Sequence, residues 1–422
     1  MRPKNLPSDE EEIIYDIAII GGGASGMMAG AVAASRGKKV LLLEKNASLG
    51  EKLKISGGGR CNITNATYDN RELLKNYGKA EQFLYSPFSQ FSVKDTFSFF
   101  ESLGLKLVTE ARNRVFPSTQ KAFDVYNTLY KELKKYNVNI QTNSPVTKIE
   151  HDGNEIKFVN CGHKQYRAKN FILATGGVSH PETGSTGDGF KWLTDLGHTV
   201  SKPTPTIVPL RTAERWSHML SGTSLTFMKI SFYLDGKKKF SKTGKILFTH
   251  FGISGPLILN SASDVADLLQ AGLVTAKIDC YPDTDLRGLE EKILKVFDEH
   301  KNKMLKNILD LIVPPGTADS IPHILKNINF DTKVHSVSKN DRKMLVEILK
   351  ALPLTITGLE GYDRAVVADG GVTLSEIDTK TMRSKILRNL LITGDLLHIR
   401  RPSGGYSLQL CWTTGFVAGI NA

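Results

Sequence analysis

The chain has 422 residues, of which 40% are hydrophobic, so it is long enough for two or three globular domains. Lysine and arginine number 55 against 43 acidic residues, and the resulting net charge of +12 fits a polyanionic partner and a lysine-rich soluble surface about equally well. The cysteines Cys61, Cys161, Cys280 and Cys411 form no C-x-x-C pair, which argues against a zinc site or a dithiol reductase and favours a reducing cytoplasm.

The first twelve residues are polar and contain two prolines, so we expect a frayed leader and not a signal peptide. No stretch of the chain approaches eighteen consecutive apolar residues, so we expect no membrane-spanning helix.

A nucleotide-binding pattern occupies residues 13–49. Ile13–Ile20 is a short apolar run typical of a buried parallel strand, and it leads directly into Gly21-Gly22-Gly23-Ala24-Ser25-Gly26, which fits G-x-G-x-x-G. A helix of small residues should follow and end at Gly37. Val40–Leu43 should form the second strand, with Glu44 after it. This order predicts a βαβ unit that binds a dinucleotide.

The three glycines of the motif have separate roles in that prediction. Gly21 allows the tight turn, Gly23 lets the backbone approach a pyrophosphate, and Gly26 lets the helix pack close to the strand. The phosphates would face free N–H groups at the start of the helix. Glu44 lies where a carboxylate accepts hydrogen bonds from the adenosine ribose, and it disfavours a 2′-phosphate. An ordinary glycine-rich turn is the alternative.

A second glycine loop, residues 55–62, places Gly57, Gly58 and Gly59 in a row, with the donors Arg60 and Asn62 beside them. A plain NAD-binding domain does not need such a loop, whereas a flavin enzyme does, because its long cofactor crosses the sheet edge. The loop therefore favours a flavin.

The next segments are expected to be structural. Residues 83–103 look helical and aromatic, which indicates packing more than base stacking. A following helix should bury one face made of Ala122, Val125, Leu129 and Leu133. Residues 139–148 and 155–159 should form strands of a small hairpin-like region.

Residues 171–177, FILATGG, should form another buried strand that ends in a small-residue turn. A third glycine loop at 184–189 opens a helix that should stop at Gly197-His198. The loop either shares a ligand with the other two or only caps this helix through Asp188 or Thr186.

The rest of the chain predicts two inserts within the nucleotide-binding domain. Residues 207–281 alternate as in a small β-barrel or sandwich, residues 283–350 look helical, and Leu352–Leu359 should be a strand that returns to the barrel. Asn389–Thr393 should then be a strand ending at Gly394-Asp395, and residues 408–420 a final helix. We expect nucleotide-binding segments at 13–200 and 362–422, barrel segments at 201–283 and 352–361, and a helical insert at 284–351.

Eight motifs occur in one order along almost the whole chain: GGGASG, GEKLKISGGGRCNITN, VFPSTQKAFDV, LATGGVSHPETGSTGDG, LFTHFGISGP, ADGGVTLSEI, TMRSK and GGYSLQ. In these motifs the chain resembles the YhiN/BaiN-like bacterial flavoproteins, which are usually described as NAD(P)/FAD-dependent oxidoreductases. The resemblance implies an α/β fold with a discontinuous Rossmann-like FAD-binding domain of the two-dinucleotide-binding-domain type, an inserted β-barrel and a small helical insert. It also implies non-covalent FAD.

The resemblance further implies which residues hold the cofactor. Residues 21–26 would hold the pyrophosphate, Glu44 the ribose, residues 56–62 would run beneath the flavin, Asp395 would hold the ribityl hydroxyls, and the final helix would point its positive end at the flavin. The expected contact set is Gly21, Gly23, Ser25, Gly26, Glu44, Lys45, Ser56, Gly57, Gly58, Gly59, Arg60, Cys61, Asn62, Thr175, Gly176, Gly394, Asp395, Gly404, Gly405, Tyr406, Ser407 and Leu408.

One segment departs from the family. The family commonly shows Gly-Glu-x-Leu-Asp-x-Asp-Gly, whereas residues 394–401 are Gly-Asp-Leu-Leu-His-Ile-Arg-Arg. Asp395 is therefore one methylene shorter, and His398 and Arg400 replace two carboxylates. We expect Arg400 either to face the flavin, to extend a basic path for phosphates, or to be a solvated surface residue.

Three functions are compatible with the sequence. The first is reduction of FAD by NADPH or NADH and hydride transfer from the flavin N5 to a carbon–carbon double bond, which the family suggests is the uracil C5–C6 bond of ribosomal RNA. The base would have to leave its stack to reach the flavin. The second is a small-molecule enone reductase or amine oxidase, and the third is a flavin-binding protein without turnover.

The candidate catalytic residues are few. Cys61 is a candidate proton donor, although a buried small-residue role competes with it. His250 is another candidate, with a core histidine as the alternative, and His180 has less support. Cys411 is expected in the core. A second G-x-G-x-x-G is absent, so a nicotinamide would bind transiently over the flavin. We predict no metal, and the sequence does not indicate an oligomeric state.

Overall fold

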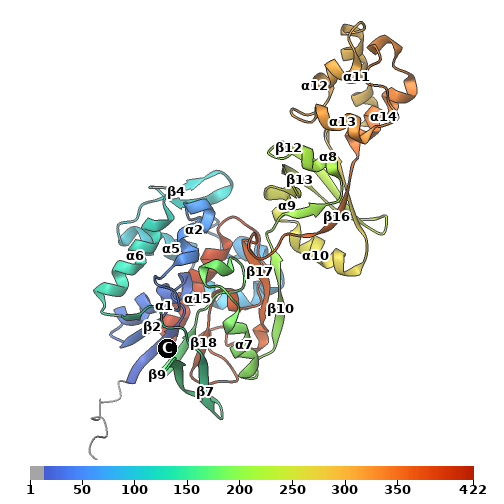
Figure 1. The fold of residues 1–422 in the computed structure, drawn as a ribbon. Coiled ribbons are helices and arrows are strands. Elements are labelled where there is room, and N and C mark those ends of the chain that lie inside the picture. The colour runs from blue at the N-terminus through green and yellow to red at the C-terminus, as the bar shows by residue number, and fades with distance from the viewer. Residues whose placement is uncertain (1–13) are drawn as a thin grey trace, which may run out of the picture. The chain divides into compact units, whose positions relative to one another are not determined.

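A computed structural model of the protein describes residues 14–422, and these residues fall into two compact units (Figure 1). Unit 1 contains residues 14–204 and 367–422, and unit 2 contains residues 205–366. The predicted leader and Ile13 lie outside the described residues. The finer division of the inserted region into barrel and helical segments remains a prediction.

Unit 1 is built on a parallel sheet. The strands β1 (Ile14–Ile20), β2 (Val40–Leu43), β6 (Asn139–Gln141), β9 (Lys164–Leu173) and β18 (Leu390–Ile392) lie in the order β6-β2-β1-β9, with β18 on β9. The strands β1, β2 and β18 consist mainly of Ile and Leu that are almost completely buried, as expected for strands covered on both faces. The α/β Rossmann-like fold class predicted from the sequence is confirmed.

Two helices of unit 1 pack against each other, α1 (Ala24–Ser35), which is rich in Ala and Gly, and α15 (Tyr406–Asn421) (Figure 1). A Cβ atom on Gly415 would lie 2.5 Å from the Ser25 carbonyl oxygen, and one on Gly419 would lie 2.7 Å from the Ala29 carbonyl oxygen. The glycines of α15 therefore let its backbone touch α1. The two helices therefore run parallel, with the start of α1 beside Gly415 of α15.

Most of the predicted elements of unit 1 are confirmed. The strand β2 has the predicted bounds, and α6 (Ala122–Lys135) buries the four residues predicted for its inner face. The other elements of unit 1 are α2 (Glu51–Ile55), η1 (Ser56–Gly59), β3 (Thr64–Asn65), α3 (Asn70–Leu74), η2 (Lys75–Ala80), α4 (Glu81–Gln90), α5 (Val93–Ser102), β4 (Leu107–Glu110), η3 (Ala111–Asn113), β5 (Arg114–Pro117), β7 (Lys148–Asp152), β8 (Glu155–Cys161), η4 (Pro181–Thr183), α7 (Asp188–Asp195), β10 (Val200–Thr206, which ends in unit 2), β17 (Val367–Val372), η8 (Leu374–Glu376) and η9 (Gly394–Leu396).

Two predictions in unit 1 were wrong. The segment that begins at Asn139 does not join a hairpin, because β6 pairs in parallel with β2 and the hairpin is formed by β7 and β8. The single helical stretch predicted for residues 83–103 is two helices, because Ser92 caps α5 and exchanges hydrogen bonds with Asp95.

Unit 2 contains the predicted barrel, which is closed in the order β11-β14-β13-β12-β15-β16. Its long strands are β12 (Ser224–Leu234) and β13 (Lys237–Thr249), and β16 (Leu352–Leu359) returns to it with the predicted bounds. The other elements are β11 (Leu210–Thr212), α8 (Arg215–Met219), β14 (Gly252–Ser254), α9 (Pro256–Leu259), α10 (Ala262–Ala271), β15 (Val274–Asp279), α11 (Leu286–Glu299), η5 (Leu305–Ile308), α12 (Leu309–Ile312), η6 (Ala318–Ser320), α13 (Ile321–Ile324), η7 (Val334–Ser336) and α14 (Lys339–Lys350).

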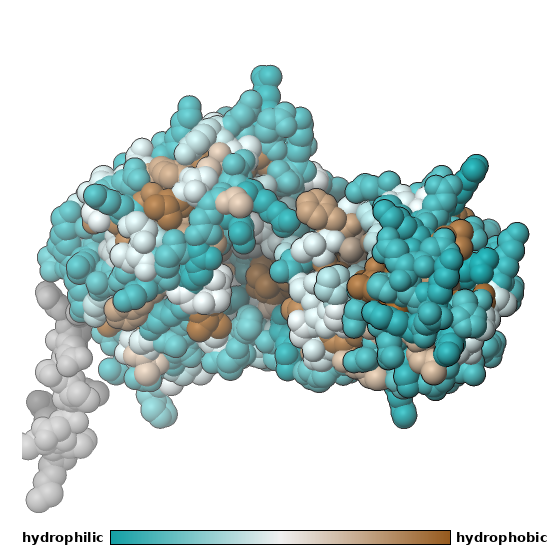
Figure 2. Space-filling model, turned by 90° about the horizontal axis from the view of Figure 1, so that it is seen from above, coloured by the Kyte–Doolittle hydropathy of each residue, from teal (hydrophilic) through white to brown (hydrophobic). Residues whose placement is uncertain are grey.

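The barrel and the helices α11 to α14 share one hydrophobic core. The short helices α8, α9 and α10 were not predicted. On the face drawn in Figure 2, both units present mainly hydrophilic side chains with scattered hydrophobic ones. Within residues 14–422 there is no helix with the length and apolar character needed to cross a bilayer.

Candidate functional site

Four loops of unit 1 meet at the carboxyl edge of the parallel sheet. They follow β2, β1, β9 and β18, and they contain Glu44, the Gly21–Gly26 turn, Thr175 and Asp395. The strands are parallel neighbours, so their carboxyl ends lie on the same side of the sheet. Ligands of open α/β sheets bind at this edge. The sequence motifs predicted for cofactor binding are thus brought together by the topology.

The glycine turn after β1 has the geometry that its three predicted roles require. Gly21 has φ +105°, and a Cβ atom there would lie 2.6 Å from the Ala174 carbonyl oxygen. A Cβ atom on Gly26 would lie 2.0 Å from the Gly21 carbonyl oxygen, whereas one on Gly23 would meet no atom within 4 Å. Gly23 therefore faces open space at the start of α1, where no side chain caps the first N–H groups. This is an open cradle of the kind that a pyrophosphate fills.

Glu44 is buried after β2 and supports the same turn. Its Oε2 accepts a hydrogen bond of 2.8 Å from the Gly22 N–H, and its Oε1 accepts one of 2.8 Å from the Asn46 N–H. Each carboxylate oxygen can accept a further bond, so ribose hydroxyls could still be bound. The neighbouring hydroxyl of Ser25 accepts a 3.1 Å hydrogen bond from Thr393, which links the start of α1 to the end of β18.

The third glycine loop lies beside the end of β2. Lys45 donates to Thr186 and forms a 2.7 Å ion pair with Asp188, and the Asn46 amide donates to the Thr183 carbonyl at 3.0 Å. The interpretation that Thr186 or Asp188 caps α7 was wrong, because α7 has Gly187 at its N-cap and no side-chain cap. Both side chains bind Lys45 instead.

The second glycine loop is open on one side. Gly58 and Gly59 have positive φ angles, and a Cβ atom on either would meet nothing within 4 Å. The Arg60 guanidinium group already has partners. It stacks on the Phe116 ring at 4.1 Å from the centroid, donates to Gln120 and forms an ion pair with Glu110, so it is not the free donor that the sequence predicts.

Five buried side-chain polar atoms among residues 14–422 have no hydrogen-bond partner, and two of them are Thr175 Oγ1, in the loop after β9, and Asn62 Oδ1, just after the second glycine loop. Native structures contain few such atoms, and a polar ligand bound here would supply hydrogen-bond partners for Thr175 and Asn62. Together with the open space at Gly23, Gly58 and Gly59, they show that the residues present fit a long dinucleotide laid across the strand ends. Which of these residues touch FAD remains a proposal.

A buried charge cluster, which sequence reasoning missed, lies at the end of β18. The Arg401 side chain is only 1% exposed, and it forms an ion pair with Asp395. Arg401 also donates to the Ser407 hydroxyl in the first turn of α15 at 3.0 Å and to the Ile399 carbonyl at 2.7 Å. Lys52 Nζ lies 3.8 Å from the other Asp395 oxygen and donates to Ser179. We call Lys52, Asp395 and Arg401 the charge cluster.

The charge cluster carries two cations and one carboxylate. Burial alone would raise the pKa of Asp395, but Arg401 and Lys52 outweigh burial and hold that pKa below its ordinary value. Burial lowers the pKa of Lys52, and Asp395 opposes this shift only in part. The positive end of α15 adds to the local positive potential. The cluster is therefore suited to stabilise an anionic ligand or negative charge that develops on one.

Arg400, the residue singled out from the sequence, lies differently from Arg401. Its side chain is 49% exposed, and its Nε lies 3.1 Å from Asp369 on β17. Arg401 stands where the family pattern has its final glycine. That replacement was a signal in the sequence, because an arginine in place of a glycine must place a large charged side chain where the family has none.

The candidate catalytic residues are not brought together. Cys61 is fully buried, and burial raises its pKa to about 12 against the opposing effect of a Ser56 hydrogen bond. His250 lies in unit 2, exposed at the turn after β13, so the alternative of a core histidine was wrong. His180 Nδ1 lies 2.8 Å from Glu182. Burial by the surrounding groups raises the pKa of Cys411 in α15 to about 12, but its side chain is partly exposed, so the prediction of a core position was wrong. The four cysteines carry free thiols.

A second polar chain in unit 1 has the connectivity of a hydrolase triad. His198 Nδ1 lies 2.9 Å from Glu376, and Ser384 Oγ lies 2.9 Å from His198 Nε2. The His198 side chain is completely buried, and Ser384 also accepts hydrogen bonds from the N–H groups of Ile386 and Leu387. A hydroxyl that is buried and holds a turn in this way cannot reach a substrate. We therefore interpret the hydrogen-bonded side chains of Ser384, His198 and Glu376 as structural.

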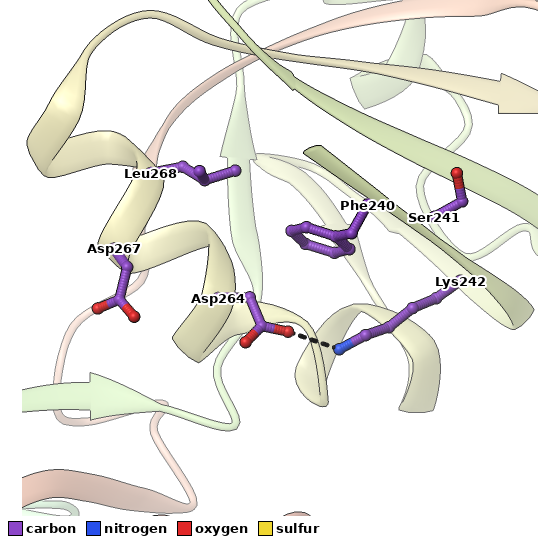
Figure 3. Close-up of a pocket in the computed structure, with 6 residues that line it drawn as sticks. All are labelled: Phe240, Ser241, Lys242, Asp264, Asp267 and Leu268. Carbon is purple, nitrogen blue, oxygen red and sulfur yellow. Dashed lines mark hydrogen bonds and ion pairs between the residues drawn. The ribbon is translucent and has the colours of Figure 1, made fainter. Parts of the chain in front are cut away.

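Figure 3 shows a pocket of unit 2 between β13 and α10. Phe240 and Leu268 give it an apolar wall, and Lys242 Nζ is neutralised by Asp264 at 2.8 Å. Within residues 14–422, no cluster of His, Cys, Asp or Glu could hold a metal ion. The cofactor features therefore concentrate at the sheet edge of unit 1.

Comparisons with known proteins agree with this geometry. The family model described as the HI0933-like protein Rossmann domain matches residues 15–421. A 3-dehydro-bile acid delta(4,6)-reductase from Clostridium scindens is 30% identical over 414 residues, which are 96% of this chain and 98% of that protein. A ribosomal RNA dihydrouridine synthase from Haemophilus influenzae is also 30% identical, over 96% of this chain and 97% of that protein.

A solved structure with a similar fold is that of a 3-ketosteroid-delta4-(5alpha)-dehydrogenase from Rhodococcus jostii RHA1, with a TM-score of 0.54, 13% identity, and coverage of 100% of this chain and 99% of that one. At that identity the likeness concerns the fold alone. The family match over almost the whole length and the two relatives at 30% identity carry the assignment. The chain belongs to the HI0933-like family of FAD-dependent oxidoreductases.

Proposed function

We propose that this oxidoreductase reduces an activated carbon–carbon double bond, and that its substrate is uracil in ribosomal RNA, which it converts to dihydrouridine. The net charge of +12 is the observation that favours RNA over a small metabolite, because phosphate neutralisation by Lys and Arg supplies much of the affinity for RNA. A relative whose name describes this reaction on ribosomal RNA, 30% identical to this chain, supports the same choice.

In this proposal the first N–H groups of α1 and the open backbone at Gly23 hold the pyrophosphate, and Glu44 accepts hydrogen bonds from the adenosine ribose. With the adenosine ribose held beside β2, the residues that follow β9 and β18 would hold the other half of the cofactor. Thr175, Asn62 and the charge cluster are the polar groups available on that side. Bound FAD would supply hydride transfer between NADH or NADPH and the substrate.

The chain's own residues would bind and orient these reactants. The charge cluster provides positive potential in a partly dry site, which favours the electron-rich state of whatever ring lies beside it. A general acid should have a pKa near the working pH, so the buried Cys61 thiol is poorly matched to proton donation. Cys61 and His250 remain predictions for this role, and a cytoplasmic location remains a proposal.

A small-molecule enone reductase is the second candidate. A relative named as a bile acid reductase is as similar to this chain as the dihydrouridine synthase from Haemophilus influenzae. Sequence identity alone therefore does not separate the two substrates. An amine oxidase has no comparable support among the named relatives.

An anaerobic reoxidation experiment separates the candidates. Purified protein loaded with FAD is reduced with NADH or NADPH, and the recovery of oxidised flavin absorbance is followed after addition of either unmodified ribosomal RNA or a steroid enone. We expect RNA to reoxidise the flavin and to gain dihydrouridine. Reoxidation by the enone alone would instead support the second candidate, and a failure of both nicotinamides to bleach the flavin would contradict the proposed electron donor.

A further inference from the structure

The outer face of three barrel strands in unit 2 combines aromatic and basic side chains. Along β12 the exposed Lys229 alternates with buried Ile230 and Phe232, so Lys229, Ser231 and Tyr233 share the outward side. The register places Lys277 of β15 opposite Ser231. Lys277 Nζ lies 5.3 Å from the centroid of the Tyr233 ring, which confirms that both side chains lie on this face.

Phe227 is the most exposed large hydrophobic residue of this face, and its backbone is strained. Its side chain is 76% exposed, and its φ is +57°, in the left-handed region that bulky residues rarely adopt. It lies in a bulge, because the register of β12 against β13 shifts between Leu225 and Met228. The exposed phenyl ring does not contribute buried area to the folded protein, and its backbone is strained. Strain of this kind is found at functional sites, so the ring is a candidate for contact with a ligand.

Lysines surround these two rings. Lys245 of β13 lies opposite the bulge, Lys229 follows it on β12, and Lys238 lies opposite Tyr233. These three lysines are exposed, and none of them has a carboxylate at ion-pair distance among residues 14–422. Asp279, which lies opposite Lys229, is neutralised by Lys350 at 2.7 Å. Residues 224–249 contain six lysines and one aspartate.

We propose that this face, defined by Phe227, Tyr233, Lys229, Lys238, Lys245 and Lys277, binds single-stranded RNA, with Phe227 stacking on an unpaired base. Proteins that bind single strands combine aromatic rings, which stack on bases, with a positive surface that follows the backbone. The inference rests on the proposed function for its choice of RNA. The pocket in Figure 3 lies on the other side of β13, toward which Phe240 and Lys242 point.

Binding of a fluorescently labelled, uridine-containing single-stranded RNA to the FAD-loaded protein, measured by anisotropy, tests the proposal. Phe227→Ala should weaken binding about tenfold, within the range expected for one stacked base. Phe227→Trp should preserve it. Lys245→Gln should lower the dependence of the logarithm of affinity on the logarithm of salt by about 0.7. Phe123→Ala, which removes a ring 57% exposed on α6, and Lys343→Gln on α14 are matched controls expected to bind like the wild type.

Phe227→Gly separates binding from folding. Glycine accepts a positive φ, so the thermal unfolding midpoint should not fall, while RNA affinity should fall as in Phe227→Ala. Equal affinity of wild type and Phe227→Ala would overturn the proposal, and so would binding to phosphatidylserine vesicles with the same dependence on Phe227. If reduced flavin is reoxidised by ribosomal RNA but Phe227→Ala binds normally, only this inference fails. If only the enone reoxidises it, the proposed function fails.

Discussion

The sheet edge of unit 1 and the outer face of the unit 2 barrel differ in the burial of their charged side chains and in the residues that adopt unusual backbone angles. At the sheet edge Gly21 and Gly26 are demanded by contacts of less than 3 Å, and the charged side chains of Asp395 and Arg401 are buried and paired. On the barrel face the lysines are exposed, and the one strained residue carries an exposed ring. Substitutions at the close-packed glycines and the charge cluster should therefore lower stability, whereas those on the barrel face should change binding alone.

The largest effect is expected from Gly26→Val. Its Cβ would lie 2.0 Å from the Gly21 carbonyl oxygen, so α1 cannot keep its place against β1. We expect loss of soluble, cooperatively folded protein, as judged by thermal unfolding.

Gly23→Val is the matched control for Gly26→Val, because a Cβ there meets nothing within 4 Å. It should leave the unfolding midpoint of the FAD-free protein near the wild-type value and abolish FAD uptake, measured by flavin absorbance after gel filtration. Normal uptake by Gly23→Val would show that the pyrophosphate does not lie at this turn.

The next largest effect is expected from Arg401→Gly, which restores the residue type of the family. Removing one partner of a buried ion pair costs about 3–5 kcal/mol of unfolding free energy. Arg400→Gly removes the neighbouring, half-exposed arginine, whose pair with the buried Asp369 should contribute less than the fully buried pair of Arg401. Urea denaturation measures both. Equal losses of unfolding free energy in the two variants would show that the buried position of Arg401 makes no difference to stability.

The pH dependence of stability sharpens the same point. The pKa of Asp395 lies below its ordinary value in the folded protein, so its contribution to stability is present above the unfolded pKa of about 4 and is lost as the pH falls through the folded pKa. Asp395→Asn should therefore lower stability at neutral pH and make it less dependent on pH between about 5 and 2. A wild-type protein and variant with parallel pH profiles would contradict the ion pairing.

A smaller effect than that of Arg401→Gly is expected from Ser384→Ala. It leaves the buried His198 Nε2 without its partner, which should cost about 1–3 kcal/mol of unfolding free energy. FAD uptake should not change, because the hydrogen bonds that join Ser384, His198 and Glu376 are structural. Hydrolysis of a nitrophenyl ester that depends on Ser384 would show that this interpretation is wrong.

The sequence predicted those parts of the fold that depend on local pattern. The apolar runs of β1 and β2 and the period of α6 are set by burial on a regular element, and the glycine turn needs φ angles that only certain residues accept. The break between α4 and α5 could also have been predicted, because Ser92 and Asp95 have the spacing of a capping box.

The parts that were missed depend on contacts between distant segments. Nothing near Asn139 in the sequence shows that it pairs with β2, since a short polar strand has no distinctive period. The charge cluster joins residues 52, 395 and 401, and only the folded chain shows that Arg401 turns inward while Arg400 stays half-exposed. The contact set for FAD remains a prediction that this geometry fits.

The dihydrouridine content of ribosomal RNA is the most direct measure of the proposed substrate. In a strain that lacks the gene, mass spectrometry of nuclease-digested ribosomal RNA should show the loss of a dihydrouridine, which the wild-type gene restores and Gly23→Val does not. A dihydrouridine content that is unchanged by the deletion, together with no dihydrouridine formed on ribosomal RNA by the purified, FAD-loaded protein, would contradict the proposal.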